Sequence, residues 1–221
     1  MDKKIELLTP KNSVLLLIDY QPQMAFGVVS IDRQMLKNNA TALACSAKLF
    51  QVPTILTSVE TESFSGYIWP ELLDIFPNHE IIERTSMNSW DSQSVRQHIE
   101  ATGRKKLILG GLWTEVCINL CAFSAMQDAY ELYVVEDACG GTSEIAHRAS
   151  MDRMIQAGVI PLCWQQLLLE WQRDWERRET YDGVMDIVKQ YSGAYGMGVD
   201  YAYTMVHKQK PRSEWKGKIV K

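Results

Sequence analysis

Apolar residues occur in short blocks along this chain, separated by polar segments. The segment "NSVLLLIDY" contains the continuous apolar run Val14–Ile18, which ends at Asp19. A run of this kind is typical of a strand that is buried on both faces of a parallel sheet. The pattern predicts further strands at 52–58, 80–84, 105–111, 131–137 and 158–163.

The segments between these runs have helical patterns. Residues 32–50 place their apolar side chains on one face, residues 91–102 begin at the capping candidate Asp91, and residues 142–157 begin near Ser143. Strands that alternate with helices imply right-handed crossovers between parallel strands. We therefore predict an α/β fold, a three-layer sandwich with helices on both faces of a parallel sheet.

The C-terminal part differs from this alternating pattern. An aromatic-rich helix is expected from Cys163 onward in "WQQLLLEWQRDWERRET", and a second helical stretch is expected at about 183–192. A glycine- and tyrosine-rich segment and a basic finish follow. We divide the chain into a domain over residues 1–180 and a C-terminal helix and tail over residues 181–221. Aromatic residues are enriched at interfaces, which favours docking of this tail on a neighbouring subunit; a flexible end is the alternative.

Composition excludes several classes of protein. With 221 residues and 46% hydrophobic composition the chain can build a substantial core, and its formal net charge of −4 gives no basic stripe for a nucleic acid. No apolar run has the length of a membrane span, and "MDKKIELLTP" lacks the apolar middle of a signal peptide, so we expect a cytoplasmic protein. The five cysteines and four histidines form no CxxC, HxH or HExxH motif, so we expect neither a disulfide framework nor a metal or other cofactor.

Three chemically capable residues follow or end predicted strands. Asp19 closes the first strand, Arg84 ends the run at 80–84, and Cys117 lies just beyond "LILGG". In open parallel sheets, ligands bind beyond the carboxyl ends of the strands. We therefore expect these three side chains to converge at one end of the sheet.

Cys117 has two interpretations. Thr114 can cap a helix that begins here, Glu115 suits its first turn, and a thiol near a helix N-terminus has a lowered pKa and a larger thiolate fraction. Free cysteine is also among the most buried residue types, which is what we expect of Cys121 one turn later. Position alone leaves both open for Cys117.

Asp19 and Arg84 favour the catalytic interpretation. A carboxylate after five apolar residues must be solvated, paired or hydrogen-bonded, so Asp19 is a helix cap, a salt-bridge partner or a general base for the thiol. Arg84 can neutralise Asp19 or stabilise a thiolate, but a guanidinium does not shuttle protons. His147 lies in a predicted helix and is expected at the surface, so a Cys/His pair is not predicted. The glycines of "GGLW" allow a sharp turn whose amides could form an oxyanion hole.

Four segments together resemble a known family. In order, "LLLIDYQ", "IERTSMNSWD", "LILGGLWTEVCI" and "VVEDACGGTSE" are similar to the successive signatures of the isochorismatase-like cysteine hydrolases, especially their YcaC-like branch, over roughly residues 10–175. This resemblance implies a six-stranded parallel sheet and an Asp–Lys/Arg–Cys triad that acts on an amide, imide or similar carbonyl compound. Cys117 would be the nucleophile, Asp19 the base and Arg84 the cation.

The resemblance also implies local geometry around the nucleophile. It predicts a non-proline cis peptide between Leu112 and Trp113, and an oxyanion hole made by the amides of Trp113 and Cys117. Trp113 replaces a residue that is usually small in the family, which predicts a crowded pocket and an unusual or slender substrate. Arg84 stands where many amidases of the superfamily have lysine, and "VETESFSGYIWPE" lacks the histidine of the nicotinamidase metal cluster.

These observations together predict a cysteine hydrolase that cleaves a C–N bond of a small carbonyl substrate through a thioester acyl-enzyme. Phe26, Asn88 and Trp90 lie near the matched positions and are candidates to line the substrate pocket, with plain packing as the alternative. Family resemblance and the tail predict a homo-oligomer. A non-catalytic or thiol-redox-responsive oligomeric protein on the same fold is the alternative function.

Overall fold

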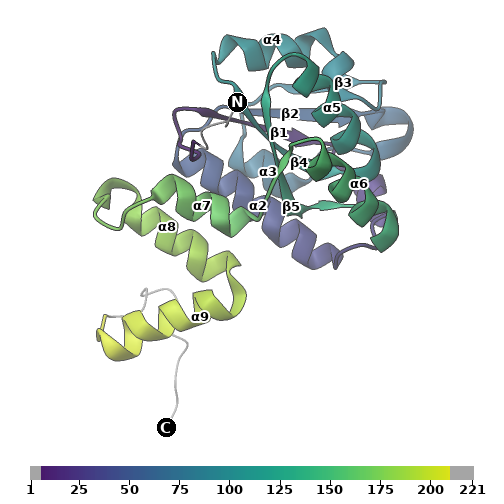
Figure 1. Cartoon of the computed structure of the whole chain (residues 1–221). Helices are drawn as coiled ribbons and strands as arrows, with labels where there is room; N and C mark the ends of the chain where they lie inside the picture. Colours follow the sequence, from purple (N-terminus) through teal and green to yellow (C-terminus); the bar gives the residue numbers. More distant parts are fainter. Residues whose placement is uncertain (1–5, 210–221) are drawn as a thin grey trace.

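The computed structural model describes residues 6–209 and contains a six-stranded, all-parallel sheet with the strand order β3-β2-β1-β4-β5-β6. This arrangement confirms the predicted fold class (Figure 1). The strands are β1 (Ser13–Ile18), β2 (Thr54–Val59), β3 (Ile81–Arg84), β4 (Lys106–Leu112), β5 (Glu131–Gly140) and β6 (Ile160–Leu162).

Helices cover both faces of this sheet. One layer contains α2 (Arg33–Leu49), α3 (Pro70–Ile75) and α7 (Trp164–Gln172), and the other contains α4 (Gln93–Ala101), α5 (Asn119–Gln127) and α6 (Glu144–Gln156) (Figure 1). Every residue of the central strands β1 and β4 is buried. Cover on both faces explains why the strands are continuous apolar runs and do not alternate with polar residues.

Side-chain caps fix where several helices begin. Asp32 caps α2 through the amide of Met35, and Ser143 caps α6 as its position predicted. The prediction of Asp91 as the cap of α4 is wrong, because the Ser92 hydroxyl accepts the hydrogen bond from the first turn of this helix. Asp91 instead ends the short 3-10 helix η2 (Ser89–Asp91).

The C-terminal helices change the predicted division of the chain. Helix α8 (Arg178–Tyr191) begins before residue 180 and buries Val184 and Val188 in the main hydrophobic core, where it packs on α2 and α7. A boundary at residue 180 therefore cuts through one core. Helix α9 (Gly193–Tyr201) and the π-helical turn η4 (Ala202–Val206) pack on α8, on its side away from the sheet (Figure 1). The basic finish over 210–221 lies outside the described residues.

Within residues 6–209, the structure contains no helix with the length and apolar character that a membrane crossing requires.

Candidate active site

The candidate site lies at the point where the strand order reverses. Strands β1 and β4 are neighbours, but the chain leaves β1 toward β2 and leaves β4 toward β5. The helices that follow β1 and β4 therefore lie on opposite faces of the sheet, which leaves a crevice between them. Such switch points are the usual ligand sites of open parallel sheets. Asp19 follows β1 and Cys117 follows β4, so both lie at this point.

Asp19 is held in an unusual backbone conformation. Its φ of 56° lies in the left-handed region, which aspartate tolerates better than most residues. Its N–H donates to the Thr57 carbonyl oxygen at 3.1 Å, and its own carbonyl accepts the Gln21 amide at 2.7 Å. The carboxylate is fully buried and accepts a hydrogen bond from the Thr57 hydroxyl at 3.4 Å. Backbone contacts on both sides therefore fix the direction of this carboxylate.

Arg84 reaches this carboxylate from β3, two strands away. Its Nη2 forms an ion pair with Asp19 Oδ2, and its Nη1 donates to the Ser86 carbonyl oxygen. The side chain is only 3% exposed, so the pair is shielded from water. The third guanidinium donor, Nε, is buried and has no hydrogen-bond partner. A buried donor without an acceptor costs about 1–3 kcal/mol.

Cys117 completes the cluster. It lies in the π-helical turn η3 (Thr114–Ile118), is 2% exposed, and its thiol lies beside the Asp19 carboxylate, with which it interacts electrostatically. The backbone N–H of Trp113 faces its sulfur. The structure thus brings Asp19, Arg84 and Cys117 together, as their places after the strands predict.

The prediction of a lowered thiol pKa is wrong. Burial, followed by the negative charge of Asp19, raises the pKa of the Cys117 thiol to about 12. Burial also raises the pKa of Asp19 to about 6, although the Arg84 cation acts in the opposite direction. At neutral pH the cluster therefore holds a protonated thiol next to an ionised carboxylate.

Thr114 and His147 also differ from their predicted roles. Thr114 does not cap the helix; its hydroxyl is hydrogen-bonded to His147 Nδ1 at 2.8 Å. The His147 side chain is half-buried, with 16% exposure, and its Nε2 lies 3.6 Å from the Glu136 carboxylate, so it is not the fully solvated residue that was expected. Through Thr114, it supports the turn that carries Cys117.

The glycines before the nucleophile are required by close packing. A Cβ on Gly111, whose φ is +155°, would lie 2.2 Å from the Ile18 carbonyl oxygen. This position lets β4 approach β1 directly before Asp19. The peptide between Leu112 and Trp113 is cis, as the resemblance predicts.

Trp113 and Phe26, predicted for the oxyanion hole and the substrate pocket, lie near and on the short helix that follows Asp19. The Trp113 indole donates to the Met24 carbonyl oxygen at 2.7 Å and packs over Gly27, so it ties the nucleophile segment to α1 (Pro22–Phe26). Phe26, on the same short helix, is 68% exposed.

Asn88 and Trp90 have structural contacts. Asn88 caps η2 through the Trp90 amide and donates to Asp91 and Ser124. Trp90 is buried, and its indole N–H donates to the Asp128 carboxylate at 2.7 Å. These contacts favour the packing alternative for both; their role in substrate binding stays a prediction.

Two positioning residues were not identified from the sequence. Gln21 is fully buried, accepts the Val59 amide at 2.9 Å, and donates to the carbonyls of Val59 and Gly66. It ties the segment after Asp19 to the end of β2. Thr57 binds Asp19 through both its backbone and its hydroxyl. The polar residues within the otherwise apolar "TILTSV" were the only signal for Thr57.

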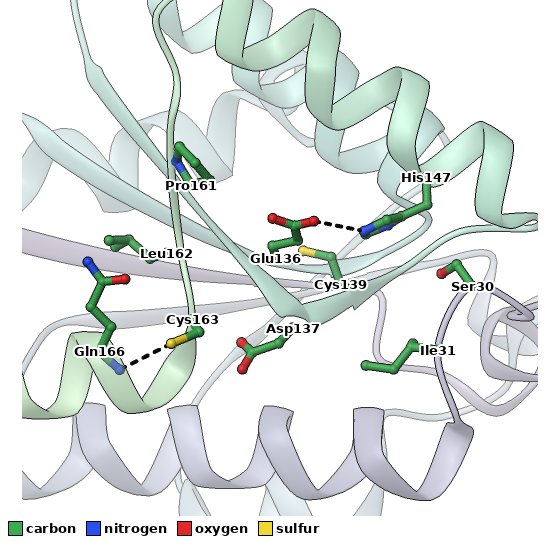
Figure 2. Close-up of a pocket in the computed structure, with 10 residues that line it drawn as sticks. All are labelled: Ser30, Ile31, Glu136, Asp137, Cys139, His147, Pro161, Leu162, Cys163 and Gln166. Carbon is green, nitrogen blue, oxygen red and sulfur yellow. Dashed lines mark hydrogen bonds and ion pairs between the residues drawn. The ribbon is translucent and has the colours of Figure 1, made fainter.

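A cavity of about 480 Å³ lies at the ends of β5 and β6, and Figure 2 shows its lining, which contains no member of the triad. His147 belongs to its wall (Figure 2). Asp137 also lines it, and burial raises the pKa of this carboxyl to about 6. Cys163 is exposed here and caps α7 through the Gln166 amide at 3.4 Å. The exposed thiol of the protein is therefore Cys163, and the buried nucleophile candidate is Cys117.

Comparison with known proteins places this geometry in a family. The Isochorismatase domain model matches residues 13–166. The probable hydrolase YcaC of Escherichia coli is 34% identical over 95% of this chain and 100% of its own length. The chain belongs to the isochorismatase family.

Solved structures of two family members agree with this assignment. E. coli YcaC, described as an octameric hydrolase of unknown specificity, has a TM-score of 0.87 and 33% identity, covering 92% of this chain and 99% of its own. YcaC from Pseudomonas aeruginosa, with hexane-2,5-diol and covalent acrylamide, has a TM-score of 0.88 and 30% identity, covering 92% and 100%. The chain is thus a hydrolase of the isochorismatase family.

Proposed function

We propose that the protein is a cysteine hydrolase that cleaves an amide, imide or related C–N bond through a thioester. One observation carries this proposal: the Cys117 thiol lies beside a buried carboxylate that is ionised at neutral pH and paired with Arg84. A thiol, a base that can accept its proton, and a cation that orients this base are the components of an activated nucleophile.

In the proposed first step, the Cys117 sulfur attacks the substrate carbonyl carbon while its proton moves to Asp19. The carbonyl oxygen gains negative charge and accepts hydrogen bonds from the amides of Trp113 and Cys117. The orientation of the Trp113 N–H toward the sulfur supports its part in this oxyanion hole. The C–N bond then breaks, and the leaving nitrogen takes the proton from Asp19.

In the second step, Asp19 removes a proton from a water molecule, which attacks the thioester carbonyl. The C–S bond breaks, the acid product forms, and the proton returns to the Cys117 sulfur. Arg84 does not accept or donate a proton in either step, because its guanidinium group stays protonated. It keeps Asp19 ionised, and its free Nε offers a donor to a substrate oxygen or a water.

The substrate is proposed to be small and slender. The sulfur is almost fully buried, and the Trp113 indole spans from the nucleophile segment to Met24 on α1. We infer that a substrate passes this side chain to reach the sulfur. Phe26, exposed on the same helix, is proposed to provide apolar surface to the substrate, and its exposure supports this role.

We also propose that the protein forms a homo-oligomer in the cytoplasm. E. coli YcaC is described as octameric, and the similarity covers most of both chains. We propose that the protein binds neither nucleic acid nor a membrane. The net charge of −4, without a basic stripe, supports this proposal.

The test is a panel of small amides, imides and ureas, with acrylamide as a covalent probe, followed by intact-mass and peptide mass spectrometry. A Cys163→Ser background removes the exposed thiol, and Cys117→Ala is the control. We expect an acyl or acrylamide adduct on Cys117 and release of amine from a true substrate. If peroxide modifies Cys117 reversibly at low dose and no carbonyl compound forms an adduct, the thiol-redox alternative replaces this proposal.

A further inference from the structure

The segment formed by α9 and η4 has one face packed on α8. The Tyr203 hydroxyl is hydrogen-bonded to the Tyr181 hydroxyl, and the Lys189 ammonium lies 4.3 Å from the centre of the Tyr203 ring. A Cβ on Gly196 would lie 2.3 Å from the Val188 carbonyl oxygen. This glycine allows the two helix backbones to approach closely, so the segment is firmly attached to α8.

The opposite face exposes large apolar side chains. Met197 is 74% exposed, Tyr201 is 61% exposed and Met205 is 64% exposed. Residues four apart lie on the same side of a helix, so these three form one stripe, which we call the outer stripe. Ala194 and Gly198 lie beside it and are also exposed.

The sequence of α9 is a poor helix former without further contacts. It contains Gly193, Gly196 and Gly198, and a glycine inside a helix costs about 1 kcal/mol relative to alanine. A helix of nine residues is marginal by itself in water. Packing against α8 accounts for Gly196, but a Cβ on Gly198 would meet no heavy atom within 4 Å. Nothing in the described chain requires a glycine at this position.

A second copy of the chain explains both features. An exposed apolar stripe on a helix is the usual mark of a contact surface. A small residue beside it lets the backbone or side chains of a partner approach closely. We propose that the outer stripe, with Gly198 beside it, packs against a second copy of this chain. This inference rests on the proposed homo-oligomer and names the surface that forms it.

A second copy is favoured over an unrelated partner for two reasons. E. coli YcaC, described as octameric, assembles from copies of its own chain. The similarity covers 92% of this chain and 99% of that one, which favours a second copy of this chain as the partner. Helix α8 packs on α2 and α7, and α9 lies on the side of α8 that faces away from the sheet (Figure 1). An outer helix with an apolar exposed face can reach a neighbouring subunit and leave the active site of its own subunit unchanged.

The experiment measures mass by light scattering and sedimentation of the full chain. The wild type is expected near eight times 25.3 kDa. Met197→Glu and Gly198→Leu should each lose this species and give smaller ones. Gly198→Leu is informative because the chain itself leaves room for the side chain. Gln190→Glu adds the same charge to α8 of the same helix pair, outside the stripe, and should keep the wild-type mass.

The outcomes separate the two proposals. A monomeric wild type overturns the proposed assembly and this inference with it. A wild-type oligomer that persists in both stripe variants overturns only the inference. Far-ultraviolet circular dichroism and acrylamide labelling of Cys117 verify that each variant keeps its fold. If Met197→Glu loses helix content, Met197→Gln replaces it, and the same loss of mass is expected.

Discussion

The proton relation between Asp19 and Cys117 makes a sharp prediction about pH. If Asp19 is the base, acrylamide should modify Cys117 at a rate that follows ionisation of this carboxyl, whose pKa is raised to about 6 by burial. The rate should rise about 30-fold between about pH 4.5 and about pH 7, and then level off, as a single titration at this pKa requires. An ordinary thiol behaves differently: its rate rises about 300-fold over this interval and continues to rise to about pH 8.5.

The pKa values show that this route is energetically accessible. The values of about 12 for Cys117 and about 6 for Asp19 differ by about six units. Full transfer of the proton before attack therefore costs at most about 8 kcal/mol, because a unit is about 1.4 kcal/mol. It is an upper limit, since protonation of Asp19 removes the charge that raises the thiol pKa. A turnover of about 10 s⁻¹ has a barrier of about 16 kcal/mol, so no preformed thiolate is needed.

The assay uses peptide mass spectrometry to follow acrylamide incorporation at Cys117 in a Cys163→Ser background, with glutathione in the same tube as the ordinary thiol. In Asp19→Asn, the rise in the modification rate near pH 6 should disappear, and the rate should follow only the ionisation of the thiol. Because this variant leaves the buried Arg84 without its anion, it will be less stable by several kcal/mol. The wild-type profile alone still decides the matter if the variant does not fold.

One result would refute this reasoning. If modification of Cys117 shows no inflection near pH 6 and rises in parallel with glutathione up to pH 9, Asp19 is not the base. The buried pair would then be structural, and the hydrolytic mechanism proposed above would lose its first step.

Three further predictions concern other parts of the molecule. Gly111→Ala should lower the free energy of unfolding by about 2–4 kcal/mol in urea titrations, because it combines overpacking with backbone strain, whereas Gly158→Ala carries the strain alone and should cost less. Trp113→Ala should raise labelling of Cys117 by a bulky maleimide about fivefold relative to acrylamide, since one lost hydrogen bond is about 1 kcal/mol; an unchanged ratio would show that the indole does not restrict entry. The pKa of Asp137 is raised from 3.8 to about 6 in the folded protein, so between these values the folded protein binds more protons than the unfolded chain and loses stability as the pH rises. Asp137→Asn should therefore reduce the fall in Tm between pH 4 and pH 6. An unchanged dependence of Tm on pH would contradict this prediction.

Local pattern was sufficient to predict the strands and most helices. Short continuous apolar runs such as Val14–Ile18 are typical of strands buried on both faces, and this property can be read from the residues themselves. The reversal of strand order could not be read from the runs, but the rule that ligands bind at strand ends placed Asp19, Arg84 and Cys117 in one region. The identity of these three candidates therefore came from the sequence.

Their protonation states came only from the tertiary structure. Helix position alone predicted a lowered pKa for Cys117, but burial and the Asp19 charge are stronger and raise it. Likewise, Thr114 is a residue type that often caps helices. In the folded chain its hydroxyl is hydrogen-bonded to His147 and does not cap the helix. The sequence determined which residues line up after the strands because strand burial and spacing are local properties. Only the folded chain decided which of them are charged, because solvent exclusion and the distance between charges depend on segments far apart in sequence.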